Sequence, residues 1–366
     1  MIKDLDDIAW FQEGPGVRNY QYTTNGTKLI NVSNLGGINL NLSNTSRYIS
    51  NEEANGKYRH FLCDAGDLVI ASSGINETSI SEKVSIIKRD DLPLCMNTSV
   101  IRFKPLNNDE LSVKYLYYFF KSDSYKKQIM KLMTGIAQLN YGPSHLHRIK
   151  INYVEKAQQE RITSQLDSLS SLVETQKKQL TLLDELVKSR FIEMFGDPIH
   201  NTKKLQTNKV NNIVTLQRGY DLPNKQRNTE GRIPLFGANG QTDFHQYGRA
   251  KNGVITGRSG SIGNVYYCKG EFWPLNTTLF SKDTHGNNVI YLCYLLRFFD
   301  LARFSNGTGV PTLNRNLFKD EQIIDVPIDA QNRFADFVEQ IDKSKFVVHS
   351  RYFLCDILTL FSSTIA

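Results

Sequence analysis

The sequence predicts an α+β protein in which one domain occurs twice and a long helix follows each copy. Three observations carry this prediction. Short patterns recur in the same order in the two halves of the 366-residue chain. Two segments, 153–197 and 329–366, have apolar residues at helical spacing. The rest alternates short β-rich runs with Gly, Asn and Ser turns, and each half adds one apolar helix, near 111–133 and near 288–304.

The repeated patterns indicate a duplication. The separation between matched residues falls from 205 for Ile8 and Ile213 to 172 for Gln159 and Gln331, as longer loops in the first half would produce. The matched segments are Ile8–Gly14 with Ile213–Gly219, Asn34 with Asn239, Leu68–Gly74 with Val254–Gly260, Asn97–Val100 with Asn276–Leu279, Tyr115–Phe120 with Tyr291–Leu296, Gly135–Asn140 with Gly309–Asn314, and Gln159–Ile162 with Gln331–Phe334. One match could arise by chance, whereas an ordered series indicates that one unit was copied.

The first long helix carries a coiled-coil seam. Its apolar residues follow a 4-3-4-3 spacing over about four heptads, and Gln176 is a polar residue within the seam. Gly196 and Pro198 predict its end, because glycine suits a left-handed cap and proline cannot continue a helix. The predicted seam residues are Ile162, Leu166, Leu169, Val173, Leu180, Leu183 and Val187 in the first helix, and Phe334, Val338 and Ile341 in the second.

These patterns predict a domain over 1–152, a helix over 153–197, a second domain over 198–328 and a second helix over 329–366. The simplest use of two such helices is an antiparallel pair, with a pseudo-two-fold relation between the halves. The alternative is that each helix packs on its own domain. A sustained heptad seam favours the pair.

The charge lies on the predicted domains. The whole chain has a net charge of +7. Residues 1–152 carry 18 Lys and Arg against 15 Asp and Glu, residues 198–330 carry 16 against 10, and the helix between them carries 6 against 8. A polyanion such as nucleic acid would therefore dock on the two domains.

Composition also indicates a compartment. The five cysteines contain no C-x-x-C pair, and an odd number argues against a disulfide framework. The acidic N-terminus has no apolar core of a signal peptide, and the apolar stretch 289–304 is broken by Arg297 and Asp300. We expect a cytoplasmic protein.

No catalytic centre is predicted. The [DE]-x-K element of many nucleases, the N-P-P-Y element of methyltransferases and the nucleophile elbow of hydrolases are all absent from the sequence. Gly257–Gly263 is better explained as a turn than as a phosphate loop. His145 and His147 have no Cys or acidic neighbour at the spacing of metal ligands, so no metal site is predicted. The pattern favours a binding protein.

Taken together, these residues resemble the specificity subunit of type I restriction–modification systems. The resemblance covers essentially the whole chain and rests on the order of repeat, helix, repeat and helix. Its most specific segments are Gln158–Ile162 and Leu186–Asp197 in the first helix, and the landmarks Gly66–Gly74, Gly253–Gly263 and Gly309–Asn314. The chain departs from the family where Val154–Glu155 replaces a Pro-rich strand end, and its second helix is expected to be the shorter one.

The resemblance implies a division of labour. Each target-recognition domain would read one half of a bipartite double-stranded DNA target, and the helices would act as a spacer that sets the gap. Two modification (methyltransferase) subunits would methylate adenine with AdoMet, and restriction subunits would cleave DNA with ATP and Mg. The chain itself would need no cofactor and would supply the DNA-sequence specificity of a methylation and restriction system.

Exposed polar loops near the repeated glycines are the candidates for DNA contact, because Arg reads guanine and Asn or Gln reads adenine in the major groove. Lys126, Lys127, Lys203 and Lys204 are candidates for phosphate contact. The predicted DNA-binding residues are Arg18, Asn19, Tyr20, Ser72, Ser73, Asn76, Gln138, Asn140 and Tyr141 in the first half, and Arg218, Tyr220, Asn239, Arg258, Ser259, Thr312, Asn314 and Arg315 in the second.

Two other functions compete with this interpretation. One is the recognition part of a fused restriction–methyltransferase enzyme, although both ends of the sequence fall at repeat boundaries. The other is a coiled-coil scaffold without DNA specificity, which leaves the placement of the charge unexplained.

Overall fold

The chain divides into two compact units, one of residues 1–175 with 351–366 and one of residues 176–350. No helix in the described part of the chain is long and apolar enough to cross a membrane. The computed structural model describes residues 1–43, 45–133, 140–227, 230–306 and 311–365, with side chains up to Ser350.

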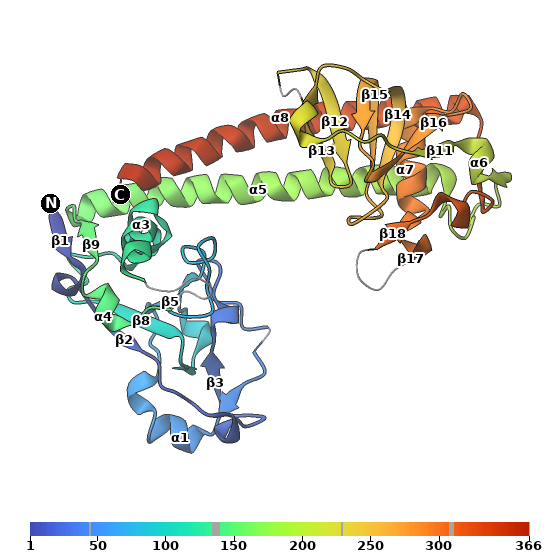
Figure 1. The fold of residues 1–366 in the computed structure, drawn as a ribbon. Helices are drawn as coiled ribbons and strands as arrows, with labels where there is room; N and C mark the ends of the chain where they lie inside the picture. Colours follow the sequence, from blue (N-terminus) through green and yellow to red (C-terminus); the bar gives the residue numbers. More distant parts are fainter. Residues whose placement is uncertain (44, 134–139, 228–229, 307–310, 366) are drawn as a thin grey trace. The chain divides into compact units, whose positions relative to one another are not determined.

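Unit 1 is built around a four-stranded sheet in the order β2-β8-β5-β6, with a three-stranded sheet β4-β3-β7 and a pair β1-β9 (Figure 1). All pairings are antiparallel except the parallel pair β3 and β7. The strands are β1 (Ile2–Asp4), β2 (Ala9–Glu13), β3 (Thr27–Ile30), β4 (Tyr48–Ile49), β5 (Leu68–Ala71), β6 (Val84–Ile86), β7 (Leu94–Met96), β8 (Val100–Pro105) and β9 (Lys150–Asn152).

The helices of unit 1 lie outside these sheets. The single apolar helix expected near 111–133 is two helices, because Ser122 has extended backbone angles and its hydroxyl accepts a hydrogen bond from Tyr125 N to start a new helix. Tyr115, Phe119 and Phe120 of the first of these helices are buried against the four-stranded sheet. The helices are α1 (Asn51–Asn55), α2 (Val113–Lys121), α3 (Asp123–Leu132) and α4 (Pro143–Leu146).

Unit 2 repeats this plan with a continuous six-stranded sheet in the order β11-β16-β14-β15-β12-β13. The parallel pair recurs between β12 and β15. The ten-residue strand β15 covers positions that unit 1 divides between β6 and β7. The elements are β10 (Thr207–Lys209), α6 (Val210–Ile213), β11 (Thr215–Arg218), β12 (Ile233–Gly237), β13 (Gly240–His245), β14 (Ala250–Gly257), β15 (Val265–Pro274), β16 (Thr278–Asp283), α7 (Val289–Phe298), β17 (Ser305–Asn306), β18 (Thr312–Leu313) and β19 (Gln322–Ile324).

The two long helices are α5 (Lys156–Phe195), of 40 residues, and α8 (Ile328–Ile365), of 38 residues. Helix α8 is the shorter of the two by two residues, and its length equals that of the predicted segment 329–366. Helix α5 ends at Gly196, which has a φ of +73°. That left-handed backbone is the one for which glycine carries no steric penalty.

The heptad seam of α5 is visible in its burial. Every predicted seam position is buried or half-buried, including Gln176, which is 9% exposed. Leucines outside the seam, at Leu172 and Leu182, are 51% and 52% exposed. Apolar character alone therefore does not decide which residues of the helix are buried. Their position in the heptad spacing decides it.

Within unit 2 the two long helices run antiparallel. The ring of Phe334 in α8 lies 5.4 Å from that of Phe191 and 5.8 Å from that of Phe195 in α5. Farther along α8, Lys345 Nζ lies 2.5 Å from Asp184 Oδ1, which is earlier in α5. Residues that come later in α8 therefore contact residues that come earlier in α5. The predicted antiparallel pair is confirmed in this unit.

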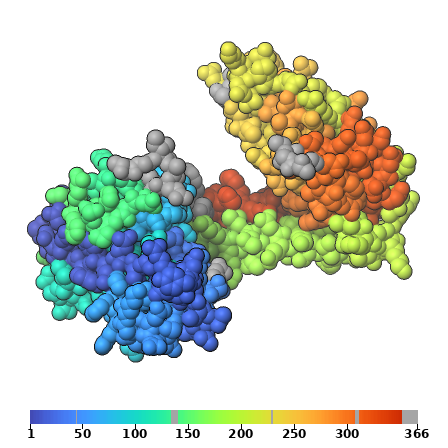
Figure 2. Space-filling model, turned by 60° about the horizontal axis from the view of Figure 1, so that its bottom comes forward, coloured from blue at the N-terminus to red at the C-terminus, as the bar shows by residue number. Residues whose placement is uncertain are grey.

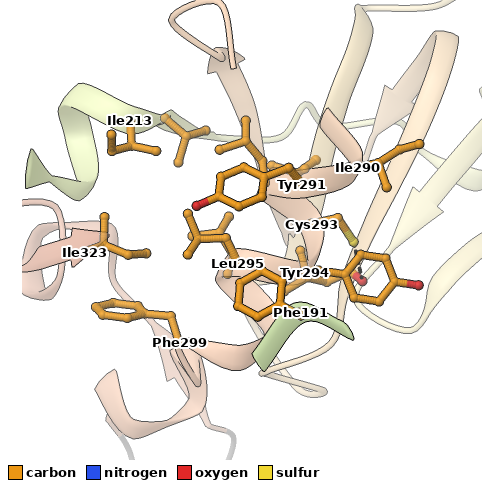
Figure 3. Close-up of a cluster of buried hydrophobic side chains, with 14 of the residues drawn as sticks. Phe191, Ile213, Ile290, Tyr291, Cys293, Tyr294, Leu295, Phe299 and Ile323 are labelled. Atoms are coloured by element: carbon orange, nitrogen blue, oxygen red, sulfur yellow. Dashed lines mark hydrogen bonds between the residues drawn. The ribbon is translucent and has the colours of Figure 1, made fainter. Parts of the chain in front are cut away.

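The core of unit 2 joins the helix pair to the six-stranded sheet. Phe191 lies against Tyr291 of α7 at a ring separation of 6.1 Å, and both are buried (Figure 3). Cys293 Sγ lies 3.3 Å from Val265 O of β15, which seats α7 on the sheet. In the surface view the orange part of unit 2 lies directly against the light-green surface of α5 (Figure 2). The sheet and the helix pair thus share one hydrophobic core.

Candidate DNA interface

In unit 2 the first candidate loop begins where β11 ends. Gly219 N donates to Thr278 O at 3.0 Å, and Tyr220 N donates to Pro274 O at 2.8 Å. A Cβ on Gly219 would meet Leu275 O at 2.1 Å. Only glycine therefore lets this loop cross the connection between β15 and β16 so closely.

The second loop follows β14. Arg258 N donates to Thr277 O at 2.8 Å, and Leu313 N donates to Arg258 O at 2.8 Å. Ser259 forms an isolated bridge with Thr312. The loop that starts at Arg258 is therefore held between the start of β16 and β18, with the Arg258 side chain half-exposed.

The third loop carries Asn314 and Arg315, both exposed. Asn314 Oδ1 accepts from Asn316 N at 3.0 Å, and Arg315 Nη1 donates to Leu216 O at 2.7 Å. Arg315 also lines an open cleft together with Arg218 and Tyr220. The first and third loops therefore meet at one surface.

Asn239 is exposed at the tip of the hairpin between β12 and β13. A Cβ on Gly257 would lie 3.2 Å from Ala238 O, so this hairpin adjoins the loop of Arg258. The structure thus brings all the candidates of the second half to one end of the sheet, namely Arg218, Tyr220, Asn239, Arg258, Ser259, Thr312, Asn314 and Arg315.

Unit 1 repeats the same backbone scheme. Gly14 N donates to Val100 O at 2.9 Å, and a Cβ on Gly14 would meet Asn97 O at 2.2 Å. Ser72 N donates to Ser99 O, and Tyr141 N donates to Ser72 O, each at 2.9 Å. The loop scaffold is therefore duplicated along with the sheet.

These bonds correct two of the sequence matches. Tyr141 bonds to Ser72 as Leu313 bonds to Arg258, so Tyr141 takes the position of Leu313 and the match of Gly135–Asn140 is shifted by two residues. The physical reason is that the two repeats correspond through the buried residue that bonds to the loop after the strand, which is Tyr141 in unit 1 and Leu313 in unit 2. The Leu-Asn pair that the two sequences share does not mark equivalent positions.

The second correction concerns the residues opposite the glycines. Gly14 faces Asn97 O, whereas Gly219 faces Leu275 O. Asn97 therefore corresponds to Leu275 and not to Asn276, a shift of one residue.

Two predicted DNA-binding residues of unit 1 are wrong. Tyr141 is 5% exposed and donates its hydroxyl to Ala71 O at 2.6 Å, and burial raises its pKa. Ser72 is 1% exposed. Both belong to the core of unit 1, since neither side chain reaches the surface.

The other candidates of unit 1 differ in placement. Asn140 is exposed, and Ser73 Oγ bonds to Ser99 Oγ beside the Gly14 turn. Asn76 is exposed, but its carboxamide oxygen caps its own turn by accepting from Ser79 N at 2.8 Å. Gln138 lies outside the described residues.

Arg18, Asn19 and Tyr20 form a turn of their own, in which Tyr20 is 85% exposed. Gln21 in this turn donates to Glu53 Oε1 at 2.7 Å and so ties it to α1. Unit 1 thus presents two sets of candidates, one around Ser73 and one around Tyr20.

The sequence missed a basic cavity beside the candidate loops of unit 2. A cavity of about 340 Å³ in unit 2 is lined by Lys282, Arg315 and Lys319, with Gln217 and Thr215 among its polar groups. Of the described residues that line it, none is acidic. No local pattern could have found it, because Lys282 lies more than 30 residues before Arg315 and Lys319 in the sequence.

Other candidates are engaged elsewhere. His147 Nδ1 lies 2.6 Å from Asp6 Oδ2, whereas His145 Nδ1 accepts from Gly142 N at 3.2 Å, so the two histidines do not converge. No cluster of three potential metal ligands occurs among the described residues. Lys203 Nζ donates to Glu193 O, and Lys126 Nζ lies 3.7 Å from Glu77 Oε1.

The family model described as type I restriction modification DNA specificity domain matches residues 2–184 and 202–350. The chain belongs to this family. Each of the two matched segments of the chain contains one copy of the duplicated loop scaffold.

Individual members of the family are more distant. A curated relative, the type I restriction enzyme MjaVIII specificity subunit of Methanocaldococcus jannaschii, is 25% identical over 189 residues, which are 51% of this chain and 43% of the relative. The chain thus matches less than half of that relative's length.

Two solved structures share the fold. One is a type I restriction–modification system S subunit from M. genitalium, with a TM-score of 0.64, 16% identity and coverage of 99% of this chain and 94% of that chain. The other comes from work on complex assembly and conformational transition of the type I R-M system, with a TM-score of 0.56, 12% identity and coverage of 98% and 97%. These likenesses establish the two-domain α+β fold.

The close glycine contacts yield a paired prediction. Gly219→Ala is expected to displace the loop of Tyr220, because its Cβ would lie 2.1 Å from a backbone oxygen, and Gly14→Ala should do the same in unit 1 at 2.2 Å. An overpacked site of this kind costs about 1–3 kcal/mol. If each unit reads one half of a bipartite DNA target, each variant should weaken recognition of a different half, which binding to duplexes altered in one half measures. Gly37→Ala is the control, since its Cβ would have 3.7 Å of space, and loss of both halves by either variant would contradict separate reading.

Proposed function

We propose that this chain is the DNA-sequence specificity subunit of a type I restriction–modification complex. Each unit reads one half of a bipartite double-stranded target, and α5 with α8 sets the unread gap. The observation that carries the proposal is the duplicated loop scaffold, in which Gly14 and Gly219 make the same close crossing. Membership of the specificity-domain family supports it.

The reading surface has chemistry suited to base edges. Arg258 supplies donors of the kind that recognise guanine, and Asn239 supplies an amide that suits adenine. Asp221, which accepts a bond from Asn276 Nδ2, adds an acceptor of the kind that reads cytosine. A rigid scaffold with loops of different sequence can read two different half-sites.

The chain is proposed to act through partners. Two modification subunits would bring AdoMet and methylate adenine, and restriction subunits would bring ATP and Mg and cleave DNA. The specificity subunit would direct them without catalysing either reaction. The family membership and the absence of catalytic motifs from the sequence support this division.

The direct test is single-molecule methylation mapping of DNA from cells that carry this chain with a cognate modification subunit. A motif of two short blocks around a constant unread gap is the expected result. A continuous motif, or methylation that does not depend on this chain, would refute the proposal.

The basic cavity of unit 2 supports a contact with the DNA backbone. It shares Gln217 and Arg315 with the open cleft of Tyr220, so a phosphate held by Lys282 and Lys319 would lie beside the bases being read. Backbone contacts of this type set the register of a protein on DNA without reading sequence.

Lys282→Ala and Lys319→Ala are each expected to weaken binding equally on all sequences and to reduce the slope of log K against log salt by about one. Titrations of DNA binding at several salt concentrations measure that slope. Lys343→Ala removes an exposed cation from α8 and should leave it unchanged. A sequence-dependent loss would show that these lysines read bases.

A further inference from the structure

Each long helix has a buried glutamine as the fourth residue of its first turn. Gln159 is 0% exposed near the start of α5, and Gln331 is 1% exposed near the start of α8. Glutamine is mostly an exposed residue. Complete burial at the same position in both copies indicates a shared role.

Gln159 makes three hydrogen bonds to backbone groups of unit 1. Its Nε2 donates to Val154 O at 2.8 Å and to Glu110 O at 2.9 Å. Its Oε1 accepts from Ser112 N at 2.9 Å, and Ser112 is the N-cap of α2. The side chain therefore joins the first turn of α5 to the start of α2.

Gln331 repeats the arrangement in unit 2. Its Nε2 donates to Val326 O at 2.8 Å and to Asn287 Oδ1 at 2.6 Å. Its Oε1 accepts from Asn288 N at 2.9 Å, and Asn288 is the N-cap of α7. The two glutamines thus form the same latch, which we define as the bonds between this side chain, the preceding strand end and the N-cap of the apolar helix.

The latch connects each long helix to the loops proposed to read DNA through the apolar helix and the sheet of the same unit. Helix α2 packs against the sheet of unit 1 and α7 against that of unit 2, and these sheets carry the loops of Gly14 and Gly219. A buried amide with three partners tolerates one orientation, because any tilt of the helix would leave a donor or an acceptor unpaired.

A small tilt at this point is magnified along the helix. From Gln159 to Phe195 the rise of an α-helix gives about 54 Å. A tilt of about 4° would move the far end by about 4 Å, and stacked bases are spaced by about 3.4 Å along DNA. Loss of the latch therefore changes the distance between half-sites on the scale of one base pair.

We propose that Gln159 and Gln331 are positioning residues that set the number of base pairs between the two half-sites. The inference rests on the proposed function, since it assumes that each unit reads one half of a split target. It concerns the gap alone, and the bases read in each half should not depend on either glutamine.

The test is methylation mapping with the full chain and its modification subunit, comparing wild type with Gln159→Leu and Gln331→Leu. The expected result is that both half-site sequences persist, while gaps one base pair shorter or longer become methylated. The preference for the native gap should fall by about tenfold in each variant. Gln158→Leu and Gln340→Leu are the controls, because these exposed glutamines lie on the same helices and lack the latch bonds.

A second substitution separates positioning from folding. Gln159→Glu keeps the length of the side chain and an acceptor for Ser112 N, but as the buried neutral acid it has only one donor for two carbonyl oxygens, so it should relax the gap in the same way. A wild-type gap preference in folded Gln159→Leu and Gln159→Glu would overturn the inference. So would unfolding of both, monitored by circular dichroism, because the residue would then serve stability alone. A wild-type protein without a split motif would instead refute the proposed function, before any variant is compared.

Discussion

Replacing Phe334 with alanine is expected to lower the free energy of unfolding of unit 2 by about 3–5 kcal/mol, the range for a large buried aromatic side chain. Phe334 is 0% exposed, and its ring contacts those of Phe191 and Phe195 in α5 and of Tyr294 in α7. The substitution therefore removes a side chain at which the helix pair and the core beneath the six-stranded sheet of unit 2 meet.

Urea denaturation of the full chain measures this effect, with the fluorescence of Trp273, which lies in unit 2, as one probe. Phe346→Ala is the matched control on the same helix, because Phe346 is 74% exposed and its loss should change stability by less than about 0.5 kcal/mol. Equal effects of the two substitutions would show that the helix pair does not share the core of unit 2.

Replacing Arg258 with alanine is expected to relax one position of one half-site, at a cost of about 1–3 kcal/mol if its guanidinium reads a guanine. Its backbone is held on both sides, by Thr277 O and by Leu313 N, while its side chain is half-exposed. The loop should therefore survive the substitution, which removes the base contact and one long hydrogen bond, from Arg258 Nη1 to Asn276 O at 3.4 Å.

Binding to a set of duplexes that vary one base pair at a time measures this effect. Arg232→Ala removes the same charge from an exposed position of unit 2 and serves as the control. An equal loss on every sequence would assign Arg258 to a phosphate, and a loss confined to the half-site read by unit 1 would contradict the assignment of this loop to unit 2.

The long helices could be predicted from sequence because their signal is local and periodic. Leu166 and Val187 are both 1% exposed at predicted seam positions, whereas Leu186 next to Val187 is 47% exposed. Composition does not distinguish these residues, but a spacing of 3.5 residues does. The duplication was equally visible, because Gly14 and Gly219 are required by backbone contacts that no other residue permits.

Other features depend on contacts between distant residues. Tyr141 looked like an exposed loop residue after Asn140, yet its hydroxyl bonds to Ala71 O in the core. Lys282 and Lys319 line one cavity only because β16 and the turn after β18 are neighbours in the fold. Ser122 breaks a predicted helix through a cap that apolar periodicity does not reveal.

By itself the sequence determined the α+β class, the tandem repeat and the helical seam of this protein, because each of these follows from local spacing and from order along the chain. Tertiary structure alone decided which loop residues are exposed, how the two repeats align residue by residue, and that Gln159 and Gln331 hold the same three-bond latch. The reason is that burial and hydrogen-bond partners are properties of groups brought together from distant positions, and a linear pattern does not contain them.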